Sequence, residues 1–308
     1  MVFGIFVGLL VAFGVYRINS SIKSRVAAPQ DTPIPGTNNS DFKIALDKPE
    51  SGDVFTQDSV VVSGLTKALA WIVISGEQGD YIIQSDEGGV FSQDVNLASG
   101  VNQIKVTALD PAGTKSAQKV IVIYSSAFQE KTFASTPPEA SGDSAIRDKV
   151  AQKVAEALNK PKAYLGTVTD ITDSTIQIKT LESEIKQVST AEEGISVVNA
   201  KGTSNKAVKL TDIAIGDFIV AMGYINSKSV LLAQRILITD PVTDPKINVN
   251  LSSMSEITIK PDKKTLAYSF SDGKTVKVKV SSIKDDDQVI YITNSSLRTI
   301  FVVDNKSS

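Results

Sequence analysis

The chain has 308 residues, of which 32 are Lys or Arg and 34 are Asp or Glu, so its formal net charge is −2 at pH 7. This balance offers no overall basic surface for neutralising phosphates, which argues against nucleic acid as a partner. The absence of Cys and His excludes cysteine nucleophiles, Ser-His-Asp triads, disulfides and zinc sites with thiolate or imidazole ligands. We expect no cofactor and no metal, and an enzyme of this composition would rely on carboxylate, Lys or Tyr chemistry.

The first sixteen residues carry no charged side chain and are apolar on every face. At about 1.5 Å per residue they cover about 24 Å, somewhat less than a hydrocarbon core of about 30 Å, and Arg17 can snorkel to make up the difference. The alternative is a cleaved signal peptide, but the small residues Ala27 and Ala28 are followed by Pro29, which blocks cleavage there. The sequence therefore predicts an uncleaved, single-pass transmembrane anchor over residues 1–18.

The side of the membrane on which the rest of the chain lies is ambiguous from charge. Arg17, Lys23 and Arg25 follow the apolar run and no basic residue precedes it, which by the positive-inside rule favours the cytoplasm. A start directly on hydrophobic residues is also what a misassigned start codon produces, with basic residues missing upstream. We expect a cell-membrane protein whose C-terminal domains are extracytoplasmic.

A linker and a β-domain follow the predicted anchor. Residues 19–42 are rich in Pro, Thr, Asn and Ser and form a linker. Residues 43–124 alternate apolar and polar residues in short runs separated by turn signals, which is typical of an Ig-like β-sandwich.

One stretch of sequence in this domain carries a distinctive motif. Gly89-Val90-Phe91 leads to Leu97-Ala98-Ser99-Gly100-Val101-Asn102, and the pattern continues to Asp110 and Gly113. It resembles the bacterial Ig-like domains of the glucodextranase type, in which a G-x-F strand leads to L-x-x-G-x-N-x-I-x-V-x-A-x-D-x-x-G. The resemblance covers about a quarter of the chain and implies an Ig-like fold. Modules of that type serve as spacers, adhesive units and accessories beside carbohydrate enzymes, so no single function is implied.

Residues 125–143 form a second linker, and an amphipathic helix is predicted at about 144–159. Its apolar stripe consists of Ile146, Val150, Val154 and Leu158, and Pro161 follows its end. The opposite face mixes acids and bases, so we expect this helix to pack on the next domain rather than on a membrane.

The remainder returns to β-structure, beginning with a small barrel that completes a domain over residues 144–242. The segment Leu210–Val220, with its Gly216-Asp217 turn, and the segment Gly166–Ile171 carry a resemblance. They are similar to an uncharacterised family of small OB-like β-barrel domains found in exported bacterial proteins, which implies the fold and no chemistry.

Residues 243–308 repeat part of this pattern and predict a second, smaller barrel-like domain. The matched positions are Ile283–Ile290 on Ile213–Val220, Thr299–Val303 on Ile236–Thr239, and Ile257 and Ile259 on Ile176 and Ile178.

Two side chains on one predicted strand are candidate contacts for a ligand or partner. The alternation places Ala70, Ile72 and Ile74 inside the sandwich and so sends Trp71 and Val73 to the other face. An outward Trp can stack on a sugar ring or dock a partner. It can equally cover a neighbouring loop or simply be exposed.

The densest acidic cluster is Asp285-Asp286-Asp287. A calcium loop of the EF-hand type would show alternating acids, a central Gly and a closing Glu, none of which is present. A polar turn before a strand is the better interpretation.

The fold class expected is thus mainly β: an N-terminal transmembrane helix, an Ig-like sandwich, one amphipathic helix and one or two small OB- or SH3-like barrels. We expect a non-enzymatic, membrane-anchored surface protein with a binding or structural role at the bacterial envelope, in contact with cell-wall glycan or an envelope protein. The alternatives are an accessory subunit of an envelope complex and a carboxylate-based envelope hydrolase. Small sandwiches and barrels lack an obvious deep cleft, which disfavours the hydrolase.

Overall fold

The computed structural model describes residues 42–128, 160–202, 205–271 and 273–303, which belong to one compact unit, Asp41–Ser308. These residues form strands and short 3-10 turns and contain no α-helix, so the mainly β class expected from the sequence is confirmed. The predicted anchor at 1–18 and the predicted helix at 144–159 lie outside the described residues.

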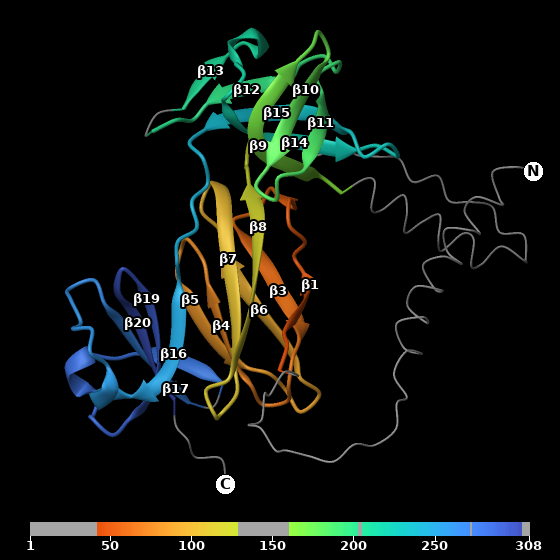
Figure 1. Ribbon diagram of the computed structural model, residues 1–308. Coiled ribbons are helices and arrows are strands. Elements are labelled where there is room, and N and C mark those ends of the chain that lie inside the picture. Colours follow the sequence, from red (N-terminus) through yellow and green to blue (C-terminus); the bar gives the residue numbers. More distant parts are fainter. Residues whose placement is uncertain (1–41, 129–159, 203–204, 272, 304–308) are drawn as a thin grey trace, which may run out of the picture. The chain divides into compact units, whose positions relative to one another are not determined.

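The sandwich unit, residues 42–128, consists of two sheets (Figure 1). Its strands are β1 (Ala45–Lys48), β2 (Val54–Phe55), β3 (Ser59–Leu65), β4 (Trp71–Ser75), β5 (Asp80–Gln84), β6 (Val90–Asn96), β7 (Gly100–Leu109) and β8 (Lys115–Tyr124). One sheet has the order β1-β3-β6 and the other β2-β8-β7-β4-β5. Alternate side chains of both sheets, among them Val62, Ile72 and Val106, fill the core between them. The strand arrangement is that of an Ig-like sandwich.

The polar residues of the sequence motif in this unit fix its turns. Gly89 has φ +80°, and a Cβ there would lie 2.0 Å from the carbonyl oxygen of Thr66, so only glycine fits. The buried amide of Asn102 accepts the N–H of Ala98 at 2.7 Å and donates to the carbonyl oxygen of the same residue. Asp110 accepts the N–H of Thr114 at 2.8 Å and closes the β7–β8 turn.

The middle unit, residues 160–240, contains a closed barrel. Its strands are β9 (Lys162–Ile171), β10 (Thr175–Thr180), β11 (Ile185–Ser189), β12 (Ser196–Asn199), β13 (Lys206–Val208), β14 (Phe218–Ile225) and β15 (Leu231–Thr239). The sheet order is β11-β10-β9-β14-β15-β12-β13, and β11 also pairs with the start of β15, which closes the ring. Alternation along β14 puts Ile219 and Ala221 in the barrel core and Val220 and Met222 on its outer face.

The C-terminal unit, residues 247–303, repeats most of the middle unit. Its strands are β16 (Asn248–Ser253), β17 (Leu266–Ser271), β18 (Lys274–Lys277), β19 (Gln288–Asn294) and β20 (Ser296–Val303), in the order β16-β19-β20-β17-β18. That order matches β9-β14-β15-β12-β13, including the parallel pairing of β20 with β17 and of β15 with β12. Both copies have an irregularity at the same place, between Met222 and Gly223 in β14 and between Ile292 and Thr293 in β19. The eight-residue match from the sequence therefore marks a structural repeat.

The two copies also share the turn that introduces the central strand. Asp217 accepts the N–H of Ala214 at 2.9 Å, and Asp287 accepts the N–H of Lys284 at 2.9 Å. Each turn follows a 3-10 turn, Leu210–Asp212 in one copy and Val280–Ser282 in the other. Asp287, the third residue of the acidic cluster, therefore closes a turn. This agrees with the interpretation of the cluster as a polar turn before a strand.

The expected match of Ile257 and Ile259 to a barrel strand is wrong. Ile257 follows the 3-10 turn Met254–Glu256 and Ile259 is exposed, so residues 254–265 contain no counterpart of the β10–β11 hairpin. Without that hairpin β16 is the end strand of its sheet. Lys115 of the sandwich donates to the carbonyl oxygen of Val249 at 3.2 Å, and Lys105 donates to that of Ile247. Two lysines of the sandwich thus contact the backbone at the start of this end strand.

Candidate functional site

Trp71 and Val73 lie on the face of β4 opposite the sandwich core, as the alternation predicts, but that face is covered. The C-terminal unit packs on it, leaving Trp71 8% exposed and Val73 fully buried. The Trp71 ring meets the ring of Phe270 edge to face, with centroids 5.0 Å apart. Ile290 and Ile292 of β19 belong to the same apolar cluster. The two candidate contact residues therefore make an internal interface in this structure, and neither is presented to a sugar or a partner.

A polar cluster borders this interface. Asp80 of β5, whose side chain is 1% exposed, pairs with the guanidinium of Arg298 at 2.9 Å. It also accepts the hydroxyl of Thr299 at 2.6 Å, and Arg298 donates to the carbonyl oxygen of Gly76 at 2.6 Å. Burial raises the pKa of Asp80 above its usual value, and the hydrogen bond from Thr299 and the charge of Arg298 offset only part of this effect.

This raised pKa gives a pH dependence that can be measured. The folded protein holds the Asp80 proton more tightly than the unfolded chain, so this contribution to stability is complete below about pH 4 and is lost as the pH rises through the folded pKa. Asp80→Asn cannot ionise, so we expect wild-type stability relative to the variant to fall as the pH rises from about 4 through the folded pKa. Urea unfolding of both proteins across this range measures the difference. Asp94→Asn, at an exposed position of β6, is the matched control. Parallel curves for wild type and Asp80→Asn would contradict the assignment.

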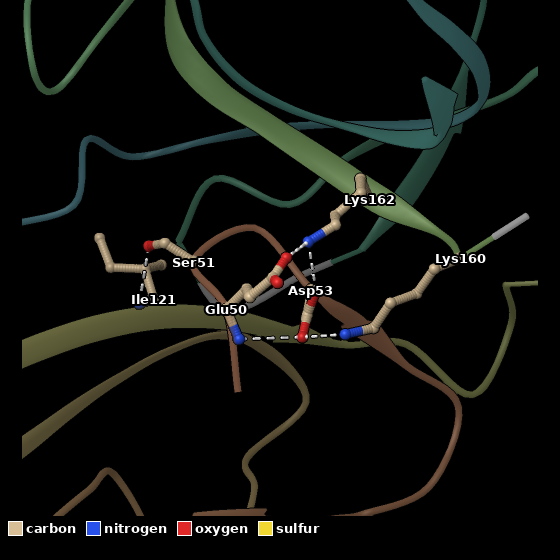
Figure 2. A network of polar contacts seen from close by, with 6 residues as sticks. All are labelled: Glu50, Ser51, Asp53, Ile121, Lys160 and Lys162. Carbon is tan, nitrogen blue, oxygen red and sulfur yellow. Dashed lines mark hydrogen bonds and ion pairs between the residues drawn. The ribbon is translucent and has the colours of Figure 1, made fainter. Parts of the chain in front are cut away.

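The middle unit meets the sandwich at a second network, shown in Figure 2. The Asp53 carboxylate, 1% exposed, pairs through Oδ2 with Lys160 at 2.6 Å and through Oδ1 with Lys162 at 2.7 Å. Oδ2 also accepts the N–H of Glu50 at 3.0 Å, and the Glu50 carboxylate pairs with Lys162. The network joins the segment before β2 to the start of β9.

Backbone contacts and an apolar cluster complete this junction. Gly52 donates to Ile121 at 2.7 Å and accepts the N–H of Ala163 at 2.7 Å. Gly52 has φ +83°, and a Cβ would lie 2.7 Å from the carbonyl oxygen of Ala163, so glycine is required. The cluster beside it consists of Val54, Ile123, Phe128, Ala163, Val220, Met222 and Tyr224.

Lys162 serves this network as a cation. Burial alone lowers the pKa of Lys162, but hydrogen bonds to Asp53 and Glu50 outweigh that effect and the pKa lies above its usual value. A lysine that acts as a nucleophile needs a lowered pKa. Lys162 stays protonated at neutral pH, and its arrangement fits an ion pair between units rather than catalysis.

A cleft of about 610 Å³ opens beside the junction. Its walls are the outer face of β12, β14 and β15, the start of β7, the end of β8 and the chain that connects the middle unit to the C-terminal unit. Gln103 donates to the carbonyl oxygen of Thr243 at 2.6 Å and holds the connecting chain against β7. The cleft is thus built from residues far apart in the sequence.

Arg235 of β15 is the cation among the described residues that line this cleft. One guanidinium nitrogen, Nη1, donates to the Ser196 hydroxyl at 3.0 Å. The Nε atom is buried and has no hydrogen-bond partner among the described residues, and burial lowers the pKa of Arg235. Sequence reasoning missed this residue; the available signal was that Arg235 is the only charged residue of the strand Leu231–Thr239.

The other sequence expectations about sites concern metals and the membrane. In the ranges that the structure describes, no group of three or more acidic residues is placed to hold a metal ion. Within those same ranges, no helix has the length and apolar character needed to cross a membrane.

No family model and no curated protein matches the chain. Solved structures match it at low similarity. One match is a structure from a study of the host cell surface retention of a 1.5-MDa bacterial ice-binding adhesin. It is 12% identical to this chain, and the match covers 86% of this chain and 99% of that chain with a TM-score of 0.21. The four N-terminal Ig domains of Dscam1 are 10% identical, with 86% and 74% covered and a TM-score of 0.19. A Ca²⁺-stabilised adhesin with which an Antarctic bacterium binds ice is 14% identical, with 80% and 69% covered and a TM-score of 0.17. At these TM-scores the likeness carries no argument about function.

Proposed function

We propose that this chain is a non-enzymatic protein of the bacterial envelope, anchored in the cell membrane by residues 1–18. It carries its β-units outside the cytoplasm, in a binding or structural role that involves contact with cell-wall glycan or another envelope protein. The uncharged run Met1–Tyr16 and the Pro-rich linker after it support the anchor.

One observation about the folded part carries the proposal. Both barrel-type units dock on the sandwich with the same outer face, Val220 and Met222 in one copy and the equivalent Ile290 and Ile292 in the other. Buried ion pairs at Asp53 and Asp80 accompany these apolar contacts. Interfaces of this kind hold units in a fixed arrangement, which suits a protein that presents surfaces rather than one that closes around a substrate.

The experiment is protease shaving of intact cells, followed by detection of the cell-associated chain with an antibody against residues 294–304. Loss of the signal is expected, because cleavage in the predicted linker at 19–42 releases everything after it. A cytoplasmic protein that stays intact is the control. Full protection in intact cells, with digestion after lysis, would contradict the proposal and move the chain to the cytoplasm.

A further inference from the structure

We propose that a groove at the junction of the sandwich and the middle unit is the docking site of the amphipathic helix predicted at 144–159. The docked helix bridges the two units, because the walls of the groove come from both. This inference concerns contacts within the folded chain and does not depend on the location proposed above.

The groove has a volume of about 250 Å³ and a mainly apolar lining. The sandwich contributes residues 51–52 and one side chain of β8, and the middle unit contributes the start of β9, the β10–β11 turn and the end of β14. Leu181 of that turn is 44% exposed, although it borders a hollow with other apolar walls. The hollow has room for a few aliphatic side chains, which is what the apolar stripe of a helix supplies. The apolar side chains that line it are Ile121, Tyr164, Leu165, Leu181 and Ile225.

Residues 129–159 lie outside the described ranges, and the residues on either side of them are fixed at this junction. Phe128 is buried in the cluster that joins the two units, and Lys160 pairs with Asp53 at 2.6 Å. Leu158, the last member of the predicted stripe, precedes Lys162 of the groove by four residues, so their Cα atoms lie within about 14 Å of each other. The covalent chain therefore keeps the end of the stripe near the groove, at a high effective concentration.

The charges beside the stripe and beside the groove are complementary. Lys149 and Lys153 are four residues apart, so in a helix they share a face and follow one border of the stripe. At the rim of the groove, Glu184 pairs with Lys186 at 2.7 Å, whereas Glu182 forms no ion pair with a described residue. A lysine at the border of the stripe thus has a carboxylate to meet when the helix is docked.

The test cross-links the purified chain, which has no native cysteine. One variant combines Val154→Cys, on the stripe, with Leu181→Cys in the groove. The matched control combines Gln152→Cys, on the opposite face of the predicted helix, with the same Leu181→Cys. The two helix positions are two residues apart, so the tether alone gives them similar rates of disulfide formation. Docking through the stripe should make the first disulfide form about tenfold faster, because only that pair is held close together.

A second measurement decides the matter if neither disulfide forms. Val154→Asp puts a charge on the stripe, and it should speed amide hydrogen exchange in the β10–β11 turn, where Thr180 and Ser183 donate backbone hydrogen bonds. Gln152→Asp should leave that exchange unchanged. Equal rates for the two disulfides, or equal exchange in the two aspartate variants, would overturn the proposal. A disulfide that joins two chains and increases with protein concentration would show that a second copy covers the groove, and would overturn it as well.

Discussion

Replacing Trp71 with alanine is expected to lower the free energy of unfolding by about 3–5 kcal/mol, the usual cost of removing a buried large aromatic side chain. The reason is its place between two units: 8% exposed, edge to face on Phe270, in a cluster that joins β4 to β19. Urea unfolding followed by far-UV circular dichroism measures the loss. Trp71→Phe, which keeps an aromatic ring there, should cost less.

The matched control for Trp71→Ala is Leu65→Ala, at a position of β3 that is 53% exposed. Surface substitutions of this kind usually change stability by no more than about 0.5 kcal/mol. If Trp71→Ala proved as stable as Leu65→Ala, the C-terminal unit would not cover β4 in solution. Trp71 would then return as a candidate for contact with a ligand.

Asp53→Ala is expected to lower the free energy of unfolding by about 3 kcal/mol, because it removes one side of a buried ion pair. Lys162, 16% exposed, would lose its buried partner, whereas Lys160, 43% exposed, can return to water. Chemical unfolding of the purified chain gives the value. Limited proteolysis around residues 160–163 should accelerate in parallel, since the backbone bonds of the junction lie beside Asp53.

Glu50→Ala serves as the control for Asp53→Ala within the same network. Glu50 is 68% exposed, and an exposed ion pair contributes at most about 1 kcal/mol. Adding Lys162→Met to Asp53→Ala should recover part of the loss, because the unpaired charge is then gone. Equal effects of Asp53→Ala and Glu50→Ala would contradict a buried role for Asp53.

Local pattern predicted the orientation of strand β4 correctly but not its surroundings. Alternation separates Ile72 and Ile74 from Trp71 and Val73, because a strand sends successive side chains to opposite faces. Whether the second face of β4 is exposed to solvent depends on a unit that begins about 170 residues later in the chain. The alternation of apolar and polar residues within the strand carries no information about that unit. Of the alternatives left open for Trp71, a covered position is therefore the one that the structure shows.

The repeat was visible at a turn and in the closing strand, where the match of Thr299–Val303 to Ile236–Thr239 falls on the equivalent strands β20 and β15. The match of Ile283–Ile290 to Ile213–Val220 includes the Asp that closes the turn before the central strand, which restrains sequence strongly. Ile257 and Ile259 matched by apolar character alone, and they belong to a segment that stands where the middle unit has a hairpin. Asp53 carried no signal of its role, and Arg235 carried only that of a lone charge in its strand, because both depend on contacts between units.

The lysine contacts at the start of β16 bear on whether the chain can be cut into smaller pieces that fold independently. The C-terminal unit has no counterpart of the β10–β11 hairpin, and Lys105 and Lys115 of the sandwich contact the backbone at the start of its end strand. Expressed alone, the C-terminal unit would expose an unpaired strand edge and an apolar face, and we expect it to self-associate. We therefore expect the C-terminal unit to need the sandwich in order to stay folded and soluble.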